Sequence, residues 1–444
     1  MSELTYDELV RELFPRLSGG IRWGLERTAR ILATAGNPHL AYQTIHVGGT
    51  NGKGSVSAML ERVLRQAGHR AGLYVSPHLC TFRERIQFNG HAIEENALVS
   101  AARTLWPAIM REAPSFFEAT TAIGFLALAE AGVEIGVIEV GLGGRLDATN
   151  VVQPVLAVLT NVALDHVQFL GPTIESVATE KAGIIKAGVP VVTAEAGASA
   201  RAVFAARAKQ QQASMRVLDA SDWSLIETGP TGTRLEYRSS DAGRIELVTP
   251  LAGRHQAANA ALAAAALETL PPALRPDVET MQAGFADVRW PGRLQLAQIE
   301  GRTWVFDVAH NVAGIESLVA ALPDLQLPQP IVALVGVLGD KDWRGMLKPI
   351  AAVCDAMILT QPLTAPDDRR WDPEAVLAET PIAHGMAIAE FAEALHAAWQ
   401  RAGDPAPGTI VVTGSFHTVG DALIALRMAP FGTDTGLPVP IFAV

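Results

Sequence analysis

The sequence is poor in cysteine and in aromatic residues, and it has no apolar run long enough to cross a membrane. Its two cysteines, Cys80 and Cys354, lie far apart, which excludes a disulfide framework and a cysteine-based zinc cluster. The Ala-rich stretch 260–267 ends at Glu268 and is too short to span a bilayer. The N-terminus lacks the basic start and apolar run of a signal peptide. These absences predict a protein of the reducing cytoplasm that has no membrane partner.

Positive charge is also scarce. The chain has 35 Lys and Arg residues against 46 Asp and Glu residues, a formal net charge of −11. A nucleic-acid surface needs a basic face, so we expect no nucleic-acid partner. If the protein binds a phosphate-containing ligand, we expect a loop and metal ions to bind it locally. The hydrophobic content of 49% indicates a well-packed globular protein, and 444 residues exceed one typical core, which favours two domains.

The segment 45–55 (IHVGGTNGKGS) is the most informative part of the chain. A β-rich run ends there in a glycine-dense turn that opens directly into a helical pattern. Such a turn directs backbone N–H groups, a helix N-terminus and the Lys53 ammonium to one point, which binds phosphate. The spacing departs from the common phosphate-loop motif, because Gly54 separates Lys53 from Ser55; the alternative is an ordinary glycine-rich turn. We predict a nucleotide site at Thr50, Asn51, Gly52, Lys53, Gly54 and Ser55.

Apolar runs typical of buried parallel strands alternate with helical patterns along the chain. Strands are expected at 44–47, 72–75, 136–140, 156–159 and 189–192, with helices at 55–67, 120–131 and 173–187. Short alternating strands follow between 214 and 248, and then a helix at 256–270. A turn-prone WPGR segment at 290–293 marks a junction. After it a second series of strands is expected, at 303–308, 331–335, 356–360 and 409–413.

This alternation predicts an α/β fold with two doubly wound domains. Residues 1–295 are expected to form the first domain, with the phosphate loop and a small β-rich excursion, and residues 296–444 the second, smaller domain. Ligands of such folds gather at the carboxyl ends of strands, where most polar clusters of this sequence lie. The Gly- and Pro-rich tail 430–444 has no role that the sequence assigns.

Further motifs accompany the phosphate loop. They are YVSPHL at 74–79, EVGLGGRLDATN at 139–150, LDH at 164–166, EKAGI at 180–184, PGR at 291–293, FDVAHN at 306–311 and GSFHT at 414–418. Their order and content resemble the folylpolyglutamate synthase/dihydrofolate synthase family, a branch of the Mur ligase superfamily, over nearly the whole chain. The resemblance implies a monomeric ATP-dependent ligase. Residues 1–295 would be an ATPase-like Mur ligase central-type domain that binds ATP and the pterin, and residues 296–444 a smaller, glutamate-binding Rossmann-like domain. It would join L-glutamate to dihydropteroate, or to the γ-carboxylate of a reduced folate, through an acyl phosphate, releasing ADP and phosphate.

The resemblance also implies two Mg²⁺ ions, with a monovalent cation such as K⁺ as a further candidate. Ser76 and Glu139 match the ligands of the first Mg²⁺, and His166 would join the second. The residue types suit magnesium, which prefers oxygen ligands, and Glu139 ends an apolar strand where an unpaired charge is costly. The alternatives are a helix-capping Ser76, a salt-bridged Glu139 and a hydrogen-bonded His166.

Lys181 lies in a predicted helix, where a solvated surface lysine is the ordinary interpretation. The resembled family carries a lysine carbamylated by CO₂ at the matching position. A lysine near a metal in a dry site has a lowered pKa, so its neutral amine can react. The resemblance therefore implies a carbamate on Lys181 and a catalytic set of Lys53, His166 and Lys181.

Three more residues match the nucleotide contacts of the family. Asn259 would contact adenine, Arg293 the phosphates and Asp307 the ribose. Arg293 follows Pro-Gly at the junction, so it would meet the phosphates only when the two domains close. The alternatives are a helix-capping Asn259 and an interdomain salt bridge between Arg293 and Asp307.

The two other substrates are placed by the same resemblance. The glutamate would be bound by Arg85, His310 and Ser415, with a surface ion pair as the alternative for Arg85. The pterin would lie against Leu25, Phe117, Glu118, Leu146, Asp147 and Ala148, although Phe117 could instead be simple core.

Other functions are less consistent with the sequence. GLGG at 141–144 is near the dinucleotide fingerprint, but Leu146 replaces its third glycine, which argues against an NAD-dependent oxidoreductase. A folylpolyglutamate synthase without the second activity stays open, as does a peptidoglycan-type Mur ligase. A non-catalytic nucleotide switch is the alternative from another class, and it would need no glutamate site.

Overall fold

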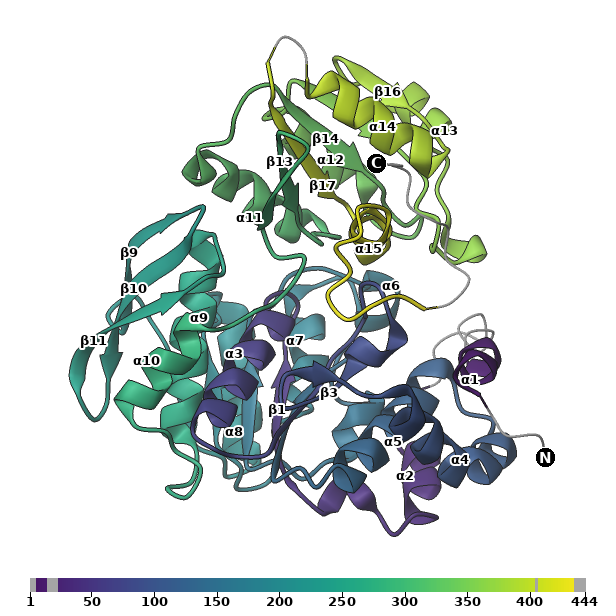
Figure 1. The fold of residues 1–444 in the computed structure, drawn as a ribbon. Helices are drawn as coiled ribbons and strands as arrows, with labels where there is room; N and C mark the ends of the chain where they lie inside the picture. The colour runs from purple at the N-terminus through teal and green to yellow at the C-terminus, as the bar shows by residue number, and fades with distance from the viewer. Residues whose placement is uncertain (1–4, 14–22, 404–405, 435–444) are drawn as a thin grey trace.

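The computed structural model describes residues 5–13, 23–403 and 406–434, which contain three β-sheets (Figure 1). The largest has the order β4-β3-β2-β5-β1-β6-β7-β8. Its neighbouring strands are parallel, except that β3 is antiparallel to β2 and to β4. In chain order they are β1 (Gln43–Gly48), β2 (Ala71–Tyr74), β3 (Ile86–Phe88), β4 (His91–Ala92), β5 (Ile135–Glu139), β6 (Leu156–Leu159), β7 (Val191–Thr193) and β8 (Met215–Val217).

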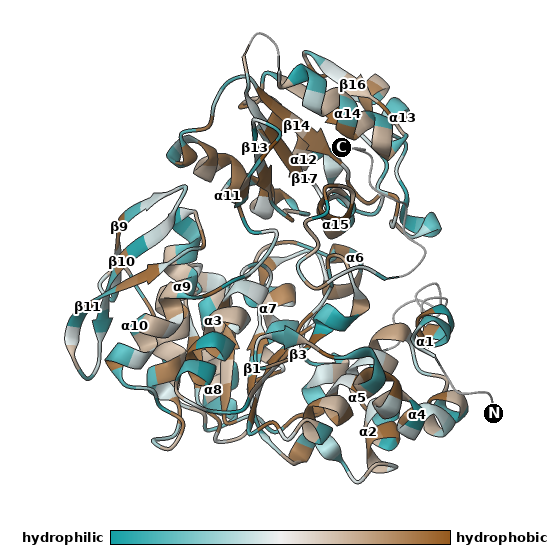
Figure 2. Cartoon of the chain, viewed as in Figure 1, coloured by the Kyte–Doolittle hydropathy of each residue, from teal (hydrophilic) through white to brown (hydrophobic). Residues whose placement is uncertain are grey.

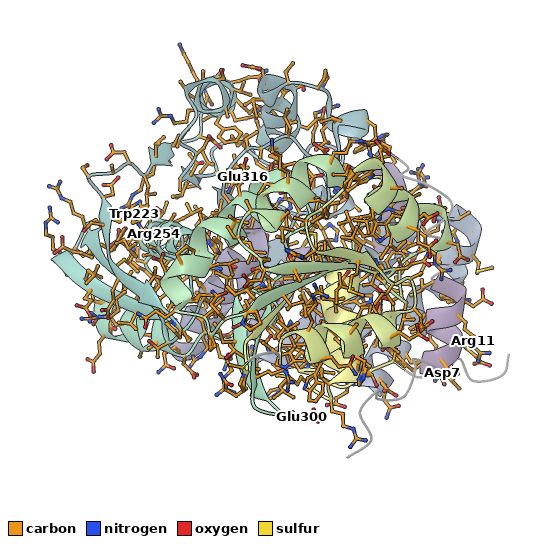
Figure 3. All side chains as sticks on the ribbon, turned by 90° about the horizontal axis from the view of Figure 1, so that it is seen from above. Asp7, Arg11, Trp223, Arg254, Glu300 and Glu316 are labelled. Carbon is orange, nitrogen blue, oxygen red and sulfur yellow. The ribbon has the colours of Figure 1, made fainter. Side chains whose placement is uncertain are left out.

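Helices cover both faces of this sheet, because its central strands are apolar on both sides. One face packs against α3 (Lys53–Gln66), α9 (Arg254–Thr269) and α10 (Val278–Ala286). The other packs against α1 (Tyr6–Leu13), α2 (Glu26–Ala33), α4 (Glu95–Glu112), α5 (Phe116–Glu130), α7 (Ile174–Ala182) and α8 (Ala198–Gln210). Figure 2 shows the hydrophobic strands (brown) inside the molecule and hydrophilic residues (teal) on the outer sides of the helices. Charged side chains such as Glu300 and Glu316 point outward (Figure 3).

A small antiparallel sheet packs on the outer side of α9. It consists of β9 (Trp223–Gly229), β10 (Gly232–Ser239) and β11 (Gly243–Thr249). The alanines of α9 are buried on all sides because this helix contacts strands of both sheets. The β-rich excursion expected between 214 and 248 is therefore present, although its first strand, β8, joins the large sheet.

The third sheet has the order β12-β13-β17-β14-β15-β16. Its strands are β12 (Gln295–Ile299), β13 (Arg302–Phe306), β14 (Ile331–Val335), β15 (Ala356–Leu359), β16 (Gly385–Ala387) and β17 (Thr409–Thr413). One face carries α11 (Val312–Ala321), α12 (Trp343–Ala351) and α13 (Pro373–Glu379), and the other carries α14 (Phe391–Arg401) and α15 (Phe416–Ala425). This arrangement confirms the predicted fold class. The boundary at 295/296 stays a prediction.

The structure differs from the expected elements mainly at edges and ends. Helix α5 begins earlier than expected, at Phe116, because the Ser115 side chain accepts a hydrogen bond from the backbone N–H of Glu118 and caps it. Helix α7 ends at Ala182, earlier than expected, and Gly183 then lies against the backbone of Arg145. The short strands β3, β4 and β16, and the antiparallel β12, were not expected. In the part of the chain that is described, no helix is long and apolar enough to cross a membrane.

The contact between α10 and α3 gives a first testable prediction. A Cβ on Gly284 would stand 2.7 Å from Cγ2 and 2.8 Å from Cα of Val63, so the two helices approach through a missing side chain. We expect Gly284→Val to lower the free energy of unfolding by about 1–3 kcal/mol, because the added methyl groups force the helices apart. Urea titration measures the change.

The matched control is Ala283→Val, at the neighbouring exposed position of the same helix. It introduces the same side chain into the same helix and should cost no more than about 0.7 kcal/mol, the difference in helix propensity. Equal losses for the two variants would show that close packing at Gly284 is not the cause.

Candidate active site

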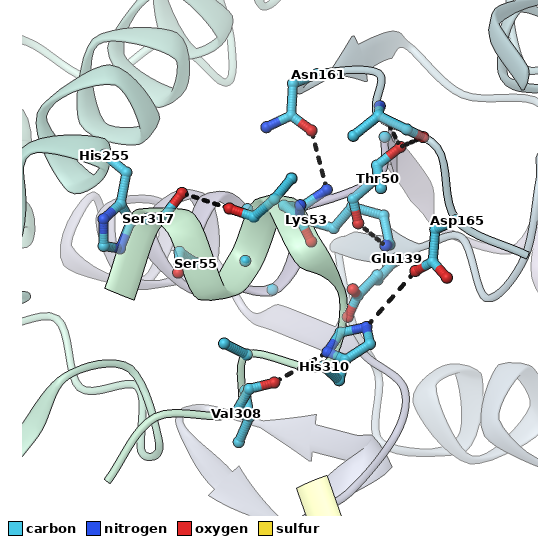
Figure 4. Close-up of a pocket in the computed structure, with 18 of the residues that line it drawn as sticks. Thr50, Lys53, Ser55, Glu139, Asn161, Asp165, His255, Val308, His310 and Ser317 are labelled. Carbon is cyan, nitrogen blue, oxygen red and sulfur yellow. Dashed lines mark hydrogen bonds and ion pairs between the residues drawn. The ribbon is translucent and has the colours of Figure 1, made fainter. Parts of the chain in front are cut away.

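The carboxyl ends of β1, β5 and β6 face the carboxyl end of β13 across one cavity of about 480 Å³ (Figure 4). Open α/β sheets bind their ligands at this edge. The structure brings together here most of the residues singled out in the sequence: Thr50, Asn51, Gly52, Lys53, Gly54, Ser55, Ser76, Glu139, His166, Lys181, Asn259, Arg293, Asp307 and His310. Their individual roles stay predictions.

The phosphate loop connects β1 to α3 and forms the floor of this cavity. Gly49 and Gly52 have φ values of 140° and 83°, a backbone conformation that residues other than glycine rarely adopt. The loop is held from β6, where the Asn161 carbonyl accepts from Thr50 N at 2.8 Å. Lys53 is the first residue of α3, and its Nζ donates to the Thr50 carbonyl at 3.0 Å. The loop thus offers a helix N-terminus and an ammonium to an anion.

Glu139 brings a buried carboxylate to the same cavity from the end of β5. Only 5% of its surface is exposed, and its Oε2 accepts from Ser76 N at 3.3 Å. Burial raises the pKa of Glu139, and the positive charge of Lys53 partly offsets this. The described residues contain no cluster of three or more His, Cys, Asp or Glu suited to a metal ion. A cation here would therefore use Glu139, the Ser76 hydroxyl, water and phosphate, which is the donor set that suits Mg²⁺.

Asp165 and His166 face a lysine of the second half that sequence reasoning missed. Lys341 Nζ donates to Asp165 Oδ1 at 2.7 Å and lies 3.2 Å from His166 Nε2. Burial and the Lys341 charge lower the pKa of His166 to about 4, so its ring is neutral at pH 7 and can accept a proton or a cation. Lys341 follows the buried strand β14 in a charged loop. In the sequence, the signal for Lys341 was its position in the loop after a buried strand.

Asn311 joins the second half directly to the phosphate loop. Its Nδ2 donates to Asn51 Oδ1 at 3.1 Å and to Asp165 Oδ2 at 3.0 Å, while its Oδ1 caps α11. The neighbouring His310 lies with Nε2 3.9 Å from Asp165 Oδ2, and its Nδ1 donates to the Val308 carbonyl at 2.9 Å. Burial, followed by the Lys341 charge, lowers the pKa of His310 to about 3. The wall of the cavity is thus built from both halves of the chain.

Lys181 is buried, in contrast to the ordinary interpretation of a lysine in a helix. Only 4% of its surface is exposed, and its Nζ donates to the Gly49 carbonyl at 2.8 Å. Burial and the nearby Lys53 charge lower the pKa of Lys181 to about 7. A large fraction of its amine is therefore neutral, and nucleophilic, at neutral pH.

The far end of the cavity is formed by the first two turns of α9. Asn259 Nδ2 donates to Gln256 Oε1 at 3.0 Å, and Gln256 Nε2 donates to Ser55 Oγ at 3.3 Å. A Cβ on Gly52 would stand 2.6 Å from Asn259 Oδ1, so this glycine permits the close approach of loop and helix. His255 and Gln256 line the cavity but were not singled out in the sequence.

Arg293 and Asp307 lie at the junction of the two halves. The guanidinium of Arg293 lies over the Phe416 ring, 5.1 Å from its centroid. Asp307 accepts from the backbone N–H groups of Leu294 and Ala309, each at 2.9 Å. The ion pairs of the described residues do not include one between Arg293 and Asp307, so Arg293 is held by an aromatic face instead of a carboxylate.

Two residues predicted to bind glutamate lie outside the cavity wall. Arg85 is buried, its Nε donates to His78 Nδ1 at 2.8 Å, and its guanidinium lies 5.2 Å from the centroid of Phe116. It is not the surface ion pair of the alternative interpretation. Ser415 is the N-cap of α15, where its Oγ accepts from Thr418 N at 3.0 Å.

The residues predicted to bind the pterin surround the other side of the loop after β5. Asp147 is buried and accepts from Leu142 N at 2.8 Å, and Glu118 accepts from Arg27 Nε at 2.9 Å. Phe117 packs against Gly141 so closely that a Cβ there would overlap its ring. Near them lie the half-buried Leu25 and Leu146 and the buried Ala148. Much of the polar capacity of Asp147 and Glu118 is thus used within the protein.

Comparisons with known proteins place the chain among ligases. Residues 47–267 match the family model described as Mur ligase middle domain, and residues 292–416 match the model described as Mur ligase, glutamate ligase domain. A dihydrofolate synthase/folylpolyglutamate synthase of Escherichia coli is 34% identical over 404 residues, 90% of each chain. A protein of the same description from Bacillus subtilis is 36% identical over 364 residues, which are 79% of this chain and 84% of the relative.

Solved structures resemble this chain over nearly its whole length. Folylpolyglutamate synthase of Mycobacterium tuberculosis complexed with ADP has a TM-score of 0.86 and 32% identity, covering 97% of this chain and 98% of that one. Escherichia coli FolC in complex with DHPP and ADP has a TM-score of 0.83 and 31% identity, covering 94% and 97%.

The buried Lys181 gives a prediction for the dependence of stability on pH. Between about pH 7 and its unfolded pKa, Lys181 is neutral when folded and protonated when unfolded, so the unfolded chain binds more protons. The wild-type free energy of unfolding should therefore rise with pH in this window relative to Lys181→Met, by up to about 1.4 kcal/mol per pH unit. Urea titrations at pH 7, 8 and 9 in CO₂-free buffer measure the difference.

The control is Lys209→Met, which removes an exposed lysine of α8. Its stability should run parallel to that of the wild type over the same pH range. A Lys181→Met curve that also runs parallel to the wild type would contradict a lowered pKa for Lys181.

Proposed function

The chain belongs to the dihydrofolate synthase/folylpolyglutamate synthase family of Mur ligases, and we propose that it adds L-glutamate to dihydropteroate, to the γ-carboxylate of reduced folates, or to both, at the expense of ATP. The observation that carries this proposal is the single cavity in which the phosphate loop, Glu139 and Lys181 of the first half meet Arg293 and His310. The relatives named for these activities match the chain on both sides of that cavity.

The chemistry requires two steps, because carboxylate oxygen is a poor leaving group. First the acid substrate attacks the γ-phosphorus of ATP, the bond from that phosphorus to the ADP oxygen breaks, and an acyl phosphate forms. Then the glutamate nitrogen attacks the acyl carbon, phosphate leaves with the bonding electrons, and the nitrogen loses its proton to solvent or a nearby base. Both steps bring anions together, so the charges of Lys53 and Arg293 serve to offset the repulsion between them.

Two Mg²⁺ ions are part of the proposal. Ser76 and Glu139 would hold the first, and His166 with a carbamate on Lys181 would hold the second. The buried carboxylate of Glu139, the neutral ring of His166 and the reactive amine of Lys181 all fit such roles. Bound there, the ions would neutralise phosphate charge. A monovalent cation such as K⁺ is the further candidate.

The remaining assignments follow the resemblance of the motifs. Asn259 would contact adenine and Asp307 the ribose, while Arg85, His310 and Ser415 would bind glutamate. The pterin would lie against Leu25, Phe117, Glu118, Leu146, Asp147 and Ala148. We further propose that the protein acts as a monomer in the cytoplasm. A second candidate is folylpolyglutamate synthase activity alone, since a relative of Lacticaseibacillus casei, 36% identical over 432 residues, bears that name only.

The test is release of ADP by the purified chain given ATP, Mg²⁺ and glutamate with one acid substrate at a time. We expect glutamate-dependent ADP release with dihydropteroate, with tetrahydrofolate, or with both, and mass spectrometry should find the acid heavier by one glutamyl residue. Activity with tetrahydrofolate alone would select the second candidate. ADP release with neither acid would refute the proposed function.

Glu139 gives a further prediction within this assay. Glu139→Gln keeps the shape of the side chain but removes the charge, so we expect kcat to fall by about 10²–10³-fold, the usual loss when one charge-stabilising group is removed. The matched control is Glu300→Gln, an exposed position in the turn between β12 and β13, which should keep kcat within about twofold. A Glu139→Gln enzyme as active as this control would exclude Glu139 from the reaction.

A further inference from the structure

The last described residues of the chain leave the second half of the molecule. After α15, residues 427–434 run back against the first half, as the yellow segment below α15 shows (Figure 1). We call residues 427–434 the C-terminal strap. Arg83 Nη2 donates to the Phe431 carbonyl at 3.1 Å, so the strap is held by a residue almost 350 positions earlier in the sequence.

Asp434 makes the strongest contacts of the strap. Its Oδ1 accepts from the hydroxyls of Tyr6 and Thr81, each at 2.6 Å, and its Oδ2 accepts from Phe82 N at 3.0 Å. Hydrogen bonds to a carboxylate are short and stronger than those between neutral groups. One side chain from the end of the described chain thus ties α1 to the segment that follows β2.

An apolar contact accompanies these hydrogen bonds. Pro430 and Phe431 of the strap lie beside Leu79 of the first half, Trp290 of the junction and Phe416 of α15, leaving a cavity of only about 20 Å³ between them. The strap therefore packs where the two halves and their junction meet. It gives the halves a second, non-covalent connection in addition to the covalent junction around residues 287–295.

The segment that Asp434 contacts is the short 3-10 helix η3 (Phe82–Arg85), which carries Arg85. The Glu84 carboxylate fixes the turn before it by accepting from Leu79 N at 2.7 Å and Cys80 N at 2.9 Å. Arg85 is buried and lies over the rings of Phe82 and Phe116, at 5.9 and 5.2 Å from their centroids. Its guanidinium cannot keep this place if the backbone of Phe82 moves.

We propose that Asp434 is a positioning residue for Arg85, so that the strap fixes the residue that the first half contributes to the glutamate site. The inference rests on the proposed function, in which Arg85 binds a carboxylate of the incoming glutamate. The hydrogen bond to Phe82 N fixes the start of η3, and the bonds to Tyr6 and Thr81 fix the carboxylate that makes it. The site for the amine substrate is then complete only when the strap lies against η3.

The experiment compares the wild type with Asp434→Ala, Asp434→Asn and two shortened chains. One chain ends after Asp434 and keeps the strap, and the other ends after Ala429 and lacks most of it. We expect Asp434→Ala and the chain ending at Ala429 to raise the KM for glutamate about tenfold or more, the effect of losing hydrogen bonds to a charged group. The KM for ATP should change by less than twofold. Asp434→Asn, which keeps one acceptor oxygen, should fall between, and the chain ending at Asp434 should match the wild type.

Hydrogen–deuterium exchange of the peptide spanning residues 79–86 provides a readout that needs no activity. We expect faster exchange in Asp434→Ala, because the Phe82 amide loses its acceptor, and wild-type exchange in the chain ending at Asp434. Faster exchange with an unchanged KM for glutamate would make Asp434 a purely structural residue and overturn the inference. Parallel increases in the KM for ATP and for glutamate would overturn it as well. A wild type inactive with every folate acid would refute the proposed function together with this inference, whereas the preceding results refute the inference alone.

Discussion

Repulsion between anions is the constraint on which the rest of the structure depends. A triphosphate and a carboxylate must meet, and each repels the other unless positive charge lies between them. The molecule places the cationic side chains of Lys53 and Arg293 around one cavity, which Glu139, Asp165 and Asp307 also line. Burial and the Lys53 charge lower the pKa of Lys181 to about 7, so this lysine adds less positive charge at neutral pH.

The two halves meet at the cavity through polar groups. Asn311 exchanges hydrogen bonds with Asn51 and also donates to Asp165, and Lys341 pairs with the same aspartate. Interfaces within a chain that are polar permit relative motion, because water can replace each partner when the surfaces part. Asp165 is the common acceptor of these contacts. The second half is therefore hydrogen-bonded directly to the loop that carries His166.

Features that depend on residues close together in the chain could be predicted from the sequence, whereas contacts between residues far apart in the chain could not. The phosphate loop and the predicted fold class could be read directly, because glycine spacing and buried apolar runs are local signals. The burial of Lys181 could not, since the residue sits in a helix of mixed pattern and meets Gly49 only after folding. Lys341, Asn311 and Asp434 make their contacts over long separations in sequence. The strands β3 and β4 were missed because strands so short leave almost no period to detect.

The alanine composition of α9 has a consequence for the shape of the cavity. This helix lies between two sheets with mostly alanine side chains, and its first two turns supply His255, Gln256 and Asn259 to the cavity wall. The small size of the alanine side chains therefore sets the distance of α9, and of the cavity wall that it carries, from the two sheets. Replacing some of these alanines by larger side chains would shift α9 and so change the shape of the cavity, although every polar residue that lines the cavity stayed the same.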